Sequence, residues 1–391
     1  MRRSPEREML VLAAREPSPQ RDHALAAAVA AVADWRAVPT LAHVHGLAPL
    51  LVRALEASAA EARVPAEERR RLTLLARATT LKSAFLFGAL ERVLERLSAR
   101  GVAPLVLKGP ALAASVYAAP ALRPFHDLDL LCRVEELAAA AECLGALGYV
   151  AEAHSATTQE GFHSVYFHPA DAAAVELHRD LLQLGLPTRC QPALWERAQP
   201  LAVGKMRVCM LSLEHQLLHL AVHLHTHGFS RLIWFKDLDL LLRRHQGEVD
   251  WVALHALARA EGVSLSLRHA LAAVRELLGT PLPPEAGRDL GWDPLGMVAH
   301  AVLWPRSRVL ALAGKQRLRS VRFNPRQGPS GVVPSLVVMG RRREKLAHLW
   351  RASRAPAGEQ PAATRRPAPA GEEVDHDAGE SLSSFDPRSH Q

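Results

Sequence analysis

The stretch LVLKGPALAASVYAAPALRPFHDLDLL, residues 105–131, decides the fold that this sequence predicts. It ends in an apolar run that carries Asp127 and Asp129, two positions apart. Side chains two positions apart in a strand project from the same face, so both carboxylates leave one side of a sheet while Leu128 and Leu130 bury on the other. Neighbouring carboxylates repel each other, and burying them is costly without a compensating charge. The pair therefore indicates a site for a divalent cation, since Mg²⁺ is held by one or two carboxylates together with substrate phosphates.

The residues before this pair predict a strand, a tight turn at Gly109 and the start of a helix. Pro110 suits the first helical turn, and backbone amides at such a turn can hold a phosphate. Each charged residue here has a second interpretation. Lys108 is either a phosphate contact or a solvated turn residue, and Arg123 is either a phosphate contact or an ion-pair partner of Asp127. The Asp pair itself is either a metal site or a structural feature such as a cap or a buried ion pair.

Together these residues resemble the uncharacterised bacterial nucleotidyltransferases of the DNA polymerase β-like superfamily. The resemblance covers roughly residues 40–280 and rests on Lys108-Gly109, Tyr117, Arg123 and the Asp127–Leu131 run. The superfamily usually has Gly-Ser where this chain has Lys108-Gly109, although the subfamily that it resembles has Lys-Gly there too. The resemblance implies an α+β fold, in which a small mixed β-sheet nucleotidyltransferase core is flanked by N-terminal and C-terminal helical regions.

The resemblance also implies a third carboxylate on a later strand, and Glu176 is the candidate. In the alternating stretch 173–178, Glu176 and His178 share one face of the expected strand. A solvent-facing Glu on an edge strand is the alternative. As family members do, the chain would use Mg²⁺ (or Mn²⁺) bound by Asp127, Asp129 and Glu176 to move a nucleoside monophosphate from a nucleoside triphosphate to an unknown hydroxyl-bearing acceptor. Lys108, Gly109 and Arg123 would contact the phosphates.

Periodic apolar spacing places the expected elements along the chain. Helices are predicted at residues 22–35, 47–61, 66–100, 110–118, 135–147 and 212–244, with two more within 250–278. Strands are predicted at residues 104–107, 126–132, 149–153, 163–168 and 173–178.

Charge and composition divide the chain into regions. A helical region is expected over 1–100, the α+β core over 101–205 and a second helical region over 206–304. Residues 305–354 hold 13 basic residues and one acidic residue, whereas residues 1–304 carry no net formal charge. The remaining segment, 355–391, is rich in Pro, Ala, Glu and Ser, which is typical of a disordered tail.

Four histidines follow one another at helical spacing in the C-terminal region. His215, His219, His223 and His227 recur every four residues, which places them along one face of a helix. A zinc site is the less favoured interpretation, because there is no HExxH motif and one helix cannot close a tetrahedral site. The favoured interpretation is that the histidines line the nucleotide cleft or are buried with hydrogen-bond partners. Asp237, further along, either orients a cleft residue or substrate or is a surface charge.

Two other functions compete with the enzyme. One is a catalytically degenerate nucleotidyltransferase fold that serves as a binding or scaffold protein. The other is a polyanion-binding protein that uses the basic segment 305–354. The four scattered cysteines predict reduced thiols and a cytoplasmic location, and the N-terminus does not resemble a signal peptide. No apolar run reaches the ~18 residues that a transmembrane helix needs.

Overall fold

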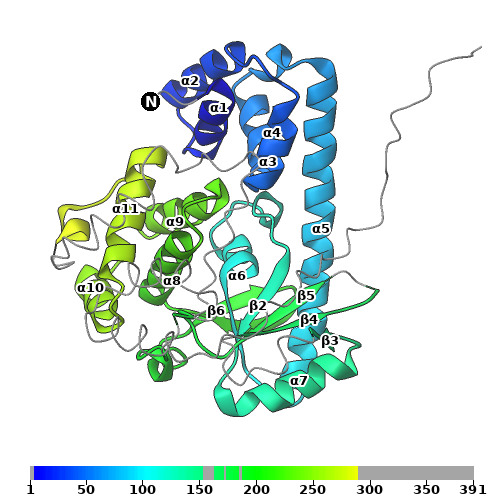
Figure 1. Ribbon diagram of the computed structural model, residues 1–391, viewed down its shortest axis with the longest axis vertical. Coiled ribbons are helices and arrows are strands. Elements are labelled where there is room, and N and C mark those ends of the chain that lie inside the picture. The colour runs from blue at the N-terminus through cyan, green and yellow to red at the C-terminus, as the bar shows by residue number, and fades with distance from the viewer. Residues whose placement is uncertain (1–3, 153–162, 171–172, 185–186, 289–391) are drawn as a thin grey trace, which may run out of the picture. The chain divides into compact units, whose positions relative to one another are not determined.

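A computed structural model describes residues 4–152, 163–170, 173–184 and 187–288 of the 391-residue chain (Figure 1). The chain divides into two units, Met1–Ala355 and Pro356–Gln391, and all the described residues belong to the first. The basic segment 305–354, the tail 355–391 and the end of the expected C-terminal helical region lie outside the described residues.

The N-terminal region is helical, as predicted. Its helices are α1 (Pro5–Ala14), α2 (Pro19–Ala30), α3 (Ala37–Val44), α4 (Ala48–Ala57) and α5 (Ala66–Ser98). The Ser18 side chain caps α2 by accepting a hydrogen bond from the Arg21 backbone N–H at 3.1 Å, and α5 is followed by Gly101 with a φ of +73°. The helices α1 and α3 were not predicted. In α1, residues 9–14 are all buried, so the helix has no polar face from which a period can be recognised.

The core is a mixed sheet of seven strands in the order β3-β4-β5-β2-β1-β7-β6. The strands are β1 (Leu105–Val106), β2 (Asp127–Leu131), β3 (Val150–Ala151), β4 (His163–Phe167), β5 (Ala174–His178), β6 (Gln199–Val203) and β7 (Met206–Met210). The central pair β2–β5 is parallel, and β1 joins it through an antiparallel ladder with β2. The predicted α+β class and mixed sheet are confirmed.

The hairpin of β6 and β7 was missed by the sequence prediction. It turns at Gly204 with a φ of +55°, and β7 pairs in parallel with β1, so the hairpin extends the sheet. Pro200 lies in β6, the edge strand, which is where a sheet tolerates proline. The sheet therefore continues to Met210, whereas the sequence placed residues after 205 with the C-terminal helices.

One face of the sheet is apolar and the other is polar, as the alternation of apolar and acidic residues along β2 and β5 predicts. Leu128, Leu130, Val175 and Leu177 are buried in one hydrophobic cluster with the second half of α5 and with α7 (Leu137–Ala146). Burying each such side chain stabilises the fold by roughly 1.5–3 kcal/mol. This packing sets the register of both strands and turns their intervening acidic side chains toward the opposite face.

The remaining helices are α6 (Lys108–Ser115), α8 (Leu213–Thr226), α9 (Leu232–Arg244), α10 (Trp251–Ala260) and α11 (Ser264–Leu278). Short 3₁₀ helices are η1 (Glu61–Arg63), η2 (Pro120–Leu122), η3 (Val134–Glu136), η4 (Gln191–Ala193) and η5 (Pro284–Gly287). The predicted helix over 212–244 is broken between α8 and α9. Gly228 and Phe229 both adopt positive φ values, +63° and +56°, which a continuous right-handed helix excludes. The break lets α9 fold back on α8.

His45 connects the N-terminal helices to α9. Its backbone carbonyl accepts a hydrogen bond from the Ile233 N–H at 3.1 Å, and its Nδ1 accepts one from the Leu232 N–H at 3.4 Å. Burial, together with the nearby charges of Arg231 and Arg7, lowers the pKa of His45 to about 4. The imidazole is therefore neutral in the folded protein at pH 7.

We expect His45 to make stability depend on pH. The unfolded chain takes up a proton on this ring near pH 6.5, but the folded chain does so only near pH 4. The stabilisation is therefore fully present above about pH 6.5 and is lost as the pH falls toward 4, by roughly 3 kcal/mol. The free energy of unfolding, measured in urea at pH 7.5 and at pH 4.5, should fall less between the two pH values for His45→Gln than for the wild type. Equal losses would show that the His45 ring titrates normally.

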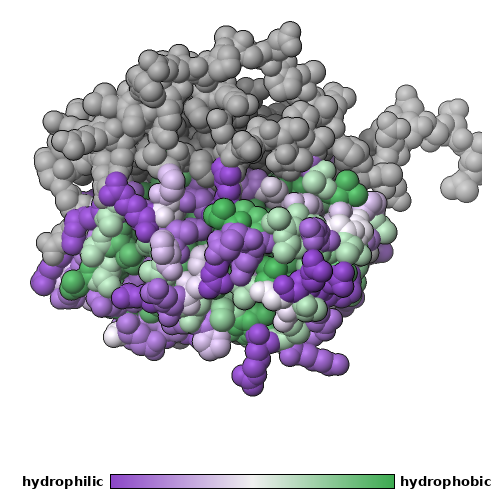
Figure 2. Space-filling model, turned by 90° about the horizontal axis from the view of Figure 1, so that it is seen from below, coloured by the Kyte–Doolittle hydropathy of each residue, from purple (hydrophilic) through white to green (hydrophobic). Residues whose placement is uncertain are grey.

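Among the described residues, no single helix is long and apolar enough to cross a membrane, and one bent pair, α3 with α4, meets those two criteria together. Seen from below, the described surface shows small hydrophobic areas separated by hydrophilic side chains (Figure 2).

Candidate functional site

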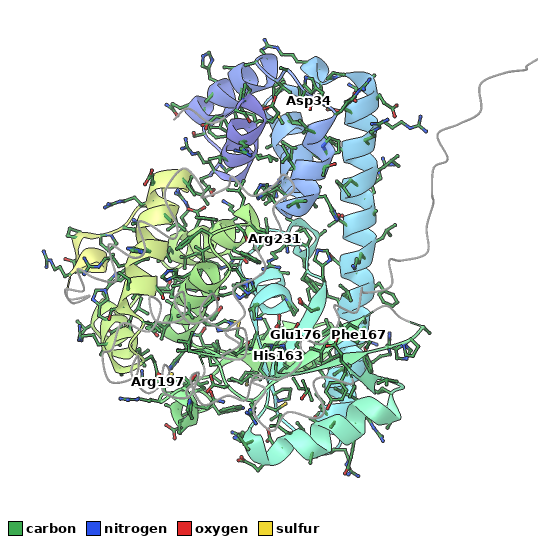
Figure 3. All side chains as sticks on the ribbon, in the orientation of Figure 1. Asp34, His163, Phe167, Glu176, Arg197 and Arg231 are labelled. Carbon is green, nitrogen blue, oxygen red and sulfur yellow. The ribbon has the colours of Figure 1, made fainter. Side chains whose placement is uncertain are left out.

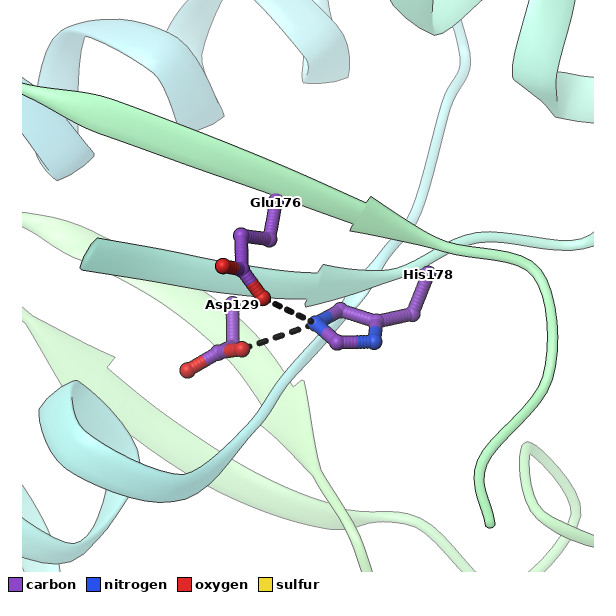
Figure 4. A group of neighbouring side chains, drawn as sticks. All are labelled: Asp129, Glu176 and His178. Atoms are coloured by element: carbon purple, nitrogen blue, oxygen red, sulfur yellow. Dashed lines mark hydrogen bonds and ion pairs between the residues drawn. The ribbon is translucent and has the colours of Figure 1, made fainter. Parts of the chain in front are cut away.

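Asp129, Glu176 and His178 meet on the polar face of the sheet (Figure 4). Asp129 and Glu176 are direct register partners across the parallel pair β2–β5, and His178 pairs with Leu131 two positions further along. One potential ligand atom from each of the three residues lies within 4.8 Å of the others. Two neighbouring strands thus bring together groups that are 49 positions apart in the sequence.

Asp129 is almost completely buried and is held from two sides. Its Oδ1 accepts hydrogen bonds from Lys108 Nζ at 2.6 Å and from His178 Nε2 at 2.7 Å. Burial alone would raise the pKa of Asp129, but the Lys108 ammonium and the His178 ring together hold that pKa well below its usual range. Asp129 is therefore ionised, and its second oxygen, Oδ2, has no hydrogen-bond partner among the described residues.

His178 was not among the predicted site residues. Its Nε2 contacts Asp129 and lies 3.6 Å from Glu176 Oε2, while its Nδ1 makes a short contact with the Gln183 side-chain amide. Burial lowers the pKa of His178, so the neutral ring donates through Nε2 and accepts through Nδ1. The alternation of strand 173–178 already placed His178 on the face of Glu176, and that was the signal by which it could have been found.

Asp127 differs from Asp129 in having no counter-ion. It lies on the same strand face but makes no ion pair or hydrogen bond within the described part of the chain. Burial and the neighbouring charge of Asp129 raise the pKa of Asp127. The three predicted carboxylates are thus on one face. Within the Asp pair, Asp129 has a positive side chain in direct contact, whereas Asp127 has none among the described residues.

Lys108 begins α6 and points at the carboxylates. Its side chain is 14% exposed and pairs with Asp129, so it is not a solvated turn residue. Burial disfavours the ammonium, yet Asp129, Glu176 and Asp127 together raise the pKa of Lys108. The left-handed residue of the predicted glycine turn is Lys108 itself, with a φ of +43°, which is a strained conformation for a side chain of this size.

Gly109 is required by packing rather than by its backbone angle. A Cβ built on Gly109 would lie 2.6 Å from the Cβ of Phe125 and 3.1 Å from Nη1 of Arg123. The glycine therefore lets α6 approach the segment that leads into β2. This close approach holds Lys108 over Asp129.

We expect Gly109→Ala to lower the free energy of unfolding by about 1–3 kcal/mol, because the added methyl group has no space beside Phe125. Gly145→Ala in α7 is a matched control, since a Cβ there meets nothing within 4 Å. Replacing glycine by alanine in an open helical position is expected to be neutral or stabilising, by up to about 1 kcal/mol. Chemical denaturation of both variants measures the difference. Equal stability of the two variants would contradict the packing explanation.

Arg123 is an ion-pair partner, but of Asp237 and not of Asp127. Its Nε and Nη2 donate to the two oxygens of Asp237 at 3.0 and 2.6 Å, and Nη1 donates to the Pro124 carbonyl at 2.8 Å. The Tyr117 hydroxyl donates to Asp237 as well, at 2.7 Å. A phosphate contact by Arg123 would require this network to open.

Asp237 is completely buried, which excludes the interpretation as a surface charge. It is the partner that Tyr117 and Arg123 share, so two residues of the sequence signature are connected to α9 through one carboxylate. Burial and the negative charge of Asp237 raise the pKa of Tyr117 well above its usual value. The network fixes the segment between α6 and β2, from which Asp127 and Asp129 follow.

The row of histidines at four-residue spacing, called the histidine stripe below, faces the cluster of Asp129, Glu176 and His178 from α8. Its members are His215, His219, His223 and His227. His219 and His223 stack with ring centroids 6.3 Å apart, and His227 continues the row against Trp234. Burial and the nearby charge of Lys108 lower the pKa of His219 to about 3, and its Nε2 has no hydrogen-bond partner within the described ranges. Together with Lys108 and Gln216, His219 lines a small cavity. His219 and His223 thus form a neutral wall beside the charged groups.

The donors present fit a divalent cation. The unpaired Asp127 carboxylate, the second oxygen of Asp129 and the Glu176 carboxylate are hard oxygen ligands on one face of the sheet, as Mg²⁺ and Mn²⁺ prefer. The ring of His178, whose Nε2 donates to Asp129, orients that carboxylate from behind in the manner of an outer-shell partner. The cluster whose ligand atoms lie within 4.8 Å of one another consists of Asp129, Glu176 and His178, and it includes neither Asp127 nor the histidines of α8.

Comparison with known proteins identifies the family of this chain. A family model described as "uncharacterised nucleotidyltransferase" matches residues 31–279, more than half of the chain. No curated protein matches the sequence. A crystal structure of an antigenic nucleotidyltransferase-like protein from Paracoccidioides brasiliensis is similar over 50% of this chain and 94% of that one, with 16% identity and a TM-score of 0.33. The extent of the family match shows that this chain belongs to the uncharacterised nucleotidyltransferase family.

Proposed function

We propose that the protein transfers a nucleoside monophosphate from a nucleoside triphosphate to a hydroxyl group, with a divalent cation, Mg²⁺ or Mn²⁺, bound at the carboxylates. The observation that carries this proposal is that Asp127 makes no ion pair or hydrogen bond among the described residues, although it lies two positions from the ionised Asp129. An unpaired carboxylate two positions from a buried, ionised one is unfavourable in the free protein. A cation bound between them would relieve the repulsion and make the site complete.

Asp127, Asp129 and Glu176 would hold the cation. When bound, it would lower the pKa of the acceptor hydroxyl and neutralise charge on the phosphates. In the transfer, the acceptor oxygen forms a bond to the α-phosphorus while the bond from that phosphorus to the bridging oxygen of the β-phosphate breaks, releasing pyrophosphate. Glu176 is the residue that would accept the hydroxyl proton, since it is the carboxylate on β5, the strand next to that of the Asp pair.

Lys108 and Gly109 have separate roles in this proposal. Lys108 already forms an ion pair with Asp129. With the cation bound, its ammonium group would also contact the phosphates. Gly109 would let the start of α6 come close to them. Arg123 would act through Asp237 by holding the segment before β2 in place.

Release of pyrophosphate tests the transfer directly. The wild type with Mg²⁺, each of the four nucleoside triphosphates and a panel of hydroxyl-bearing acceptors should release pyrophosphate with at least one combination. The panel would include sugars, sugar phosphates, aminoglycosides and Ser-, Thr- and Tyr-containing peptides. Metal-dependent binding of a triphosphate without release in any combination would instead favour the degenerate binding protein.

A further inference from the structure

A group of positive side chains lies beside Asp127, where β2 begins. It consists of Arg231, the residue before α9, and Lys82 on α5, and the charges of both act on the neutral ring of His126, the residue before Asp127. Lys82 Nζ is 3.3 Å from Nδ1 of His126. Burial, Lys82 and Arg231 are the largest causes that lower the pKa of His126 to about 4. Two positive side chains from distant parts of the chain thus lie near the residue that precedes the first carboxylate of the pair.

Arg231 is held in place without a counter-ion. Its Nε donates to the Val44 carbonyl at 2.9 Å, and its guanidinium carbon lies 5.5 Å from the centre of the Trp234 ring. Gly46, with a φ of +71°, leaves room for the side chain, since a Cβ there would be 3.3 Å from Nη2 of Arg231. Arg231 makes no ion pair in the part of the chain that the structure describes. Figure 3 labels it where α9 approaches the N-terminal helices.

The contrast with Arg123 identifies which arginine can meet an anion. Arg123 uses Nε and both Nη groups on Asp237 and the Pro124 carbonyl. Arg231 uses only Nε, so both of its Nη groups remain for a ligand. The charges of Arg123 and Asp127 act on the Arg231 guanidinium, and the Arg231 charge in turn lowers the pKa of Asp127.

We propose that Arg231 and Lys82 bind the β- and γ-phosphates of the nucleoside triphosphate, an inference that rests on the proposed function. A free guanidinium can bind two phosphate oxygens at once. The Lys82 ammonium adds a second positive charge, so the two side chains together suit a ligand with more than one negative charge. The group adjoins Asp127, whereas Glu176 lies on the next strand. The pyrophosphate leaving group therefore lies toward α5 and α9, and the acceptor approaches from the side of Glu176.

Calorimetric titration with Mg²⁺ present tests this assignment. The ligands are inorganic tripolyphosphate and the nucleoside triphosphate that the wild type binds most tightly. Arg231→Gln should weaken both by about tenfold or more, and Lys82→Gln by roughly threefold, because Lys82 is exposed. Arg77→Gln is the matched control. It removes one positive charge from α5, about 140° around the helix from Lys82, and should leave both affinities within about twofold of the wild type.

The outcomes separate this inference from the proposed function. If the wild type binds a triphosphate with Mg²⁺ and Asp127→Asn abolishes that binding, but Arg231→Gln keeps the wild-type affinity, the phosphate assignment is wrong and the proposed function stands. A loss in Arg77→Gln equal to that in Arg231→Gln would also overturn the assignment, since it would show a general charge effect. If the wild type binds no triphosphate, both proposals fail. Thermal unfolding of Arg231→Gln checks that the variant is folded.

Discussion

Asp237→Asn is expected to lower the free energy of unfolding by about 3–5 kcal/mol, the usual cost of removing one partner from a buried ion pair. The carboxylate is completely buried and accepts three hydrogen bonds, two from Arg123 and one from Tyr117. The substitution leaves the buried Arg123 guanidinium without its counter-ion. The melting temperature should fall by roughly 10 °C.

Asp34→Asn is the matched control for this prediction. Asp34 is exposed near the far end of the N-terminal helices, and its carboxylate accepts one hydrogen bond, from the Arg36 N–H at 3.1 Å (Figure 3). The same chemical change there should leave the melting temperature close to that of the wild type. The double variant Arg123→Met/Asp237→Leu should recover part of the stability, because it removes both charges together. A wild-type melting temperature for Asp237→Asn would contradict the role given to this network.

Asp127→Asn and Glu176→Gln should each reduce metal-dependent transfer by about 100-fold or more, since each removes a ligand charge worth several kcal/mol in the transition state. Asp127→Asn should leave stability unchanged or raised, because it removes a repulsive charge that has no partner. Asp129→Asn should instead destabilise the protein, because Lys108 would lose its buried counter-ion. Asp127→Asn and Asp129→Asn are thus expected to have different effects on the stability of the protein but similar effects on its activity.

Glu142→Gln is the control for these carboxylates. Glu142 lies on α7, on the far side of the sheet, and pairs with Arg100 on the surface. It should keep both the stability and the transfer rate of the wild type. If Asp127→Asn or Glu176→Gln retained wild-type transfer, the carboxylates could not form the catalytic site. Initial rates of pyrophosphate release and thermal unfolding, measured on the same preparations, provide the two readouts.

The sequence predicted the carboxylate face because the features that specify it are local. The two-residue period of β2 and β5 sets the direction of Asp127, Asp129 and Glu176 regardless of how the strands pair. The same period placed His178 beside them. The contact between His178 and Asp129 depends on which strands are neighbours, and the sequence alone does not settle that order.

Other parts of the site depend on contacts between distant residues. Asp237 lies 114 positions after Arg123, so nothing near Arg123 in the sequence identifies its partner. The positive φ of Lys108, next to a glycine that could have adopted it more easily, follows from the packing of Gly109 on Phe125. The hairpin β6–β7 was hidden by a proline that only an edge strand accommodates. In each case a tertiary contact overrides the local preference.

A metal-dependent nucleotide site at the carboxylates is tested most directly by calorimetric titration of the wild type with each nucleoside triphosphate, in Mg²⁺ and again in excess chelator. We expect at least one triphosphate to bind ten or more times as tightly with Mg²⁺, because the cation relieves the repulsion at Asp127, and we expect Asp127→Asn to abolish the gain. Equal affinity of every triphosphate in Mg²⁺ and in chelator, or no binding in either, would contradict a metal-dependent nucleotide site at these carboxylates.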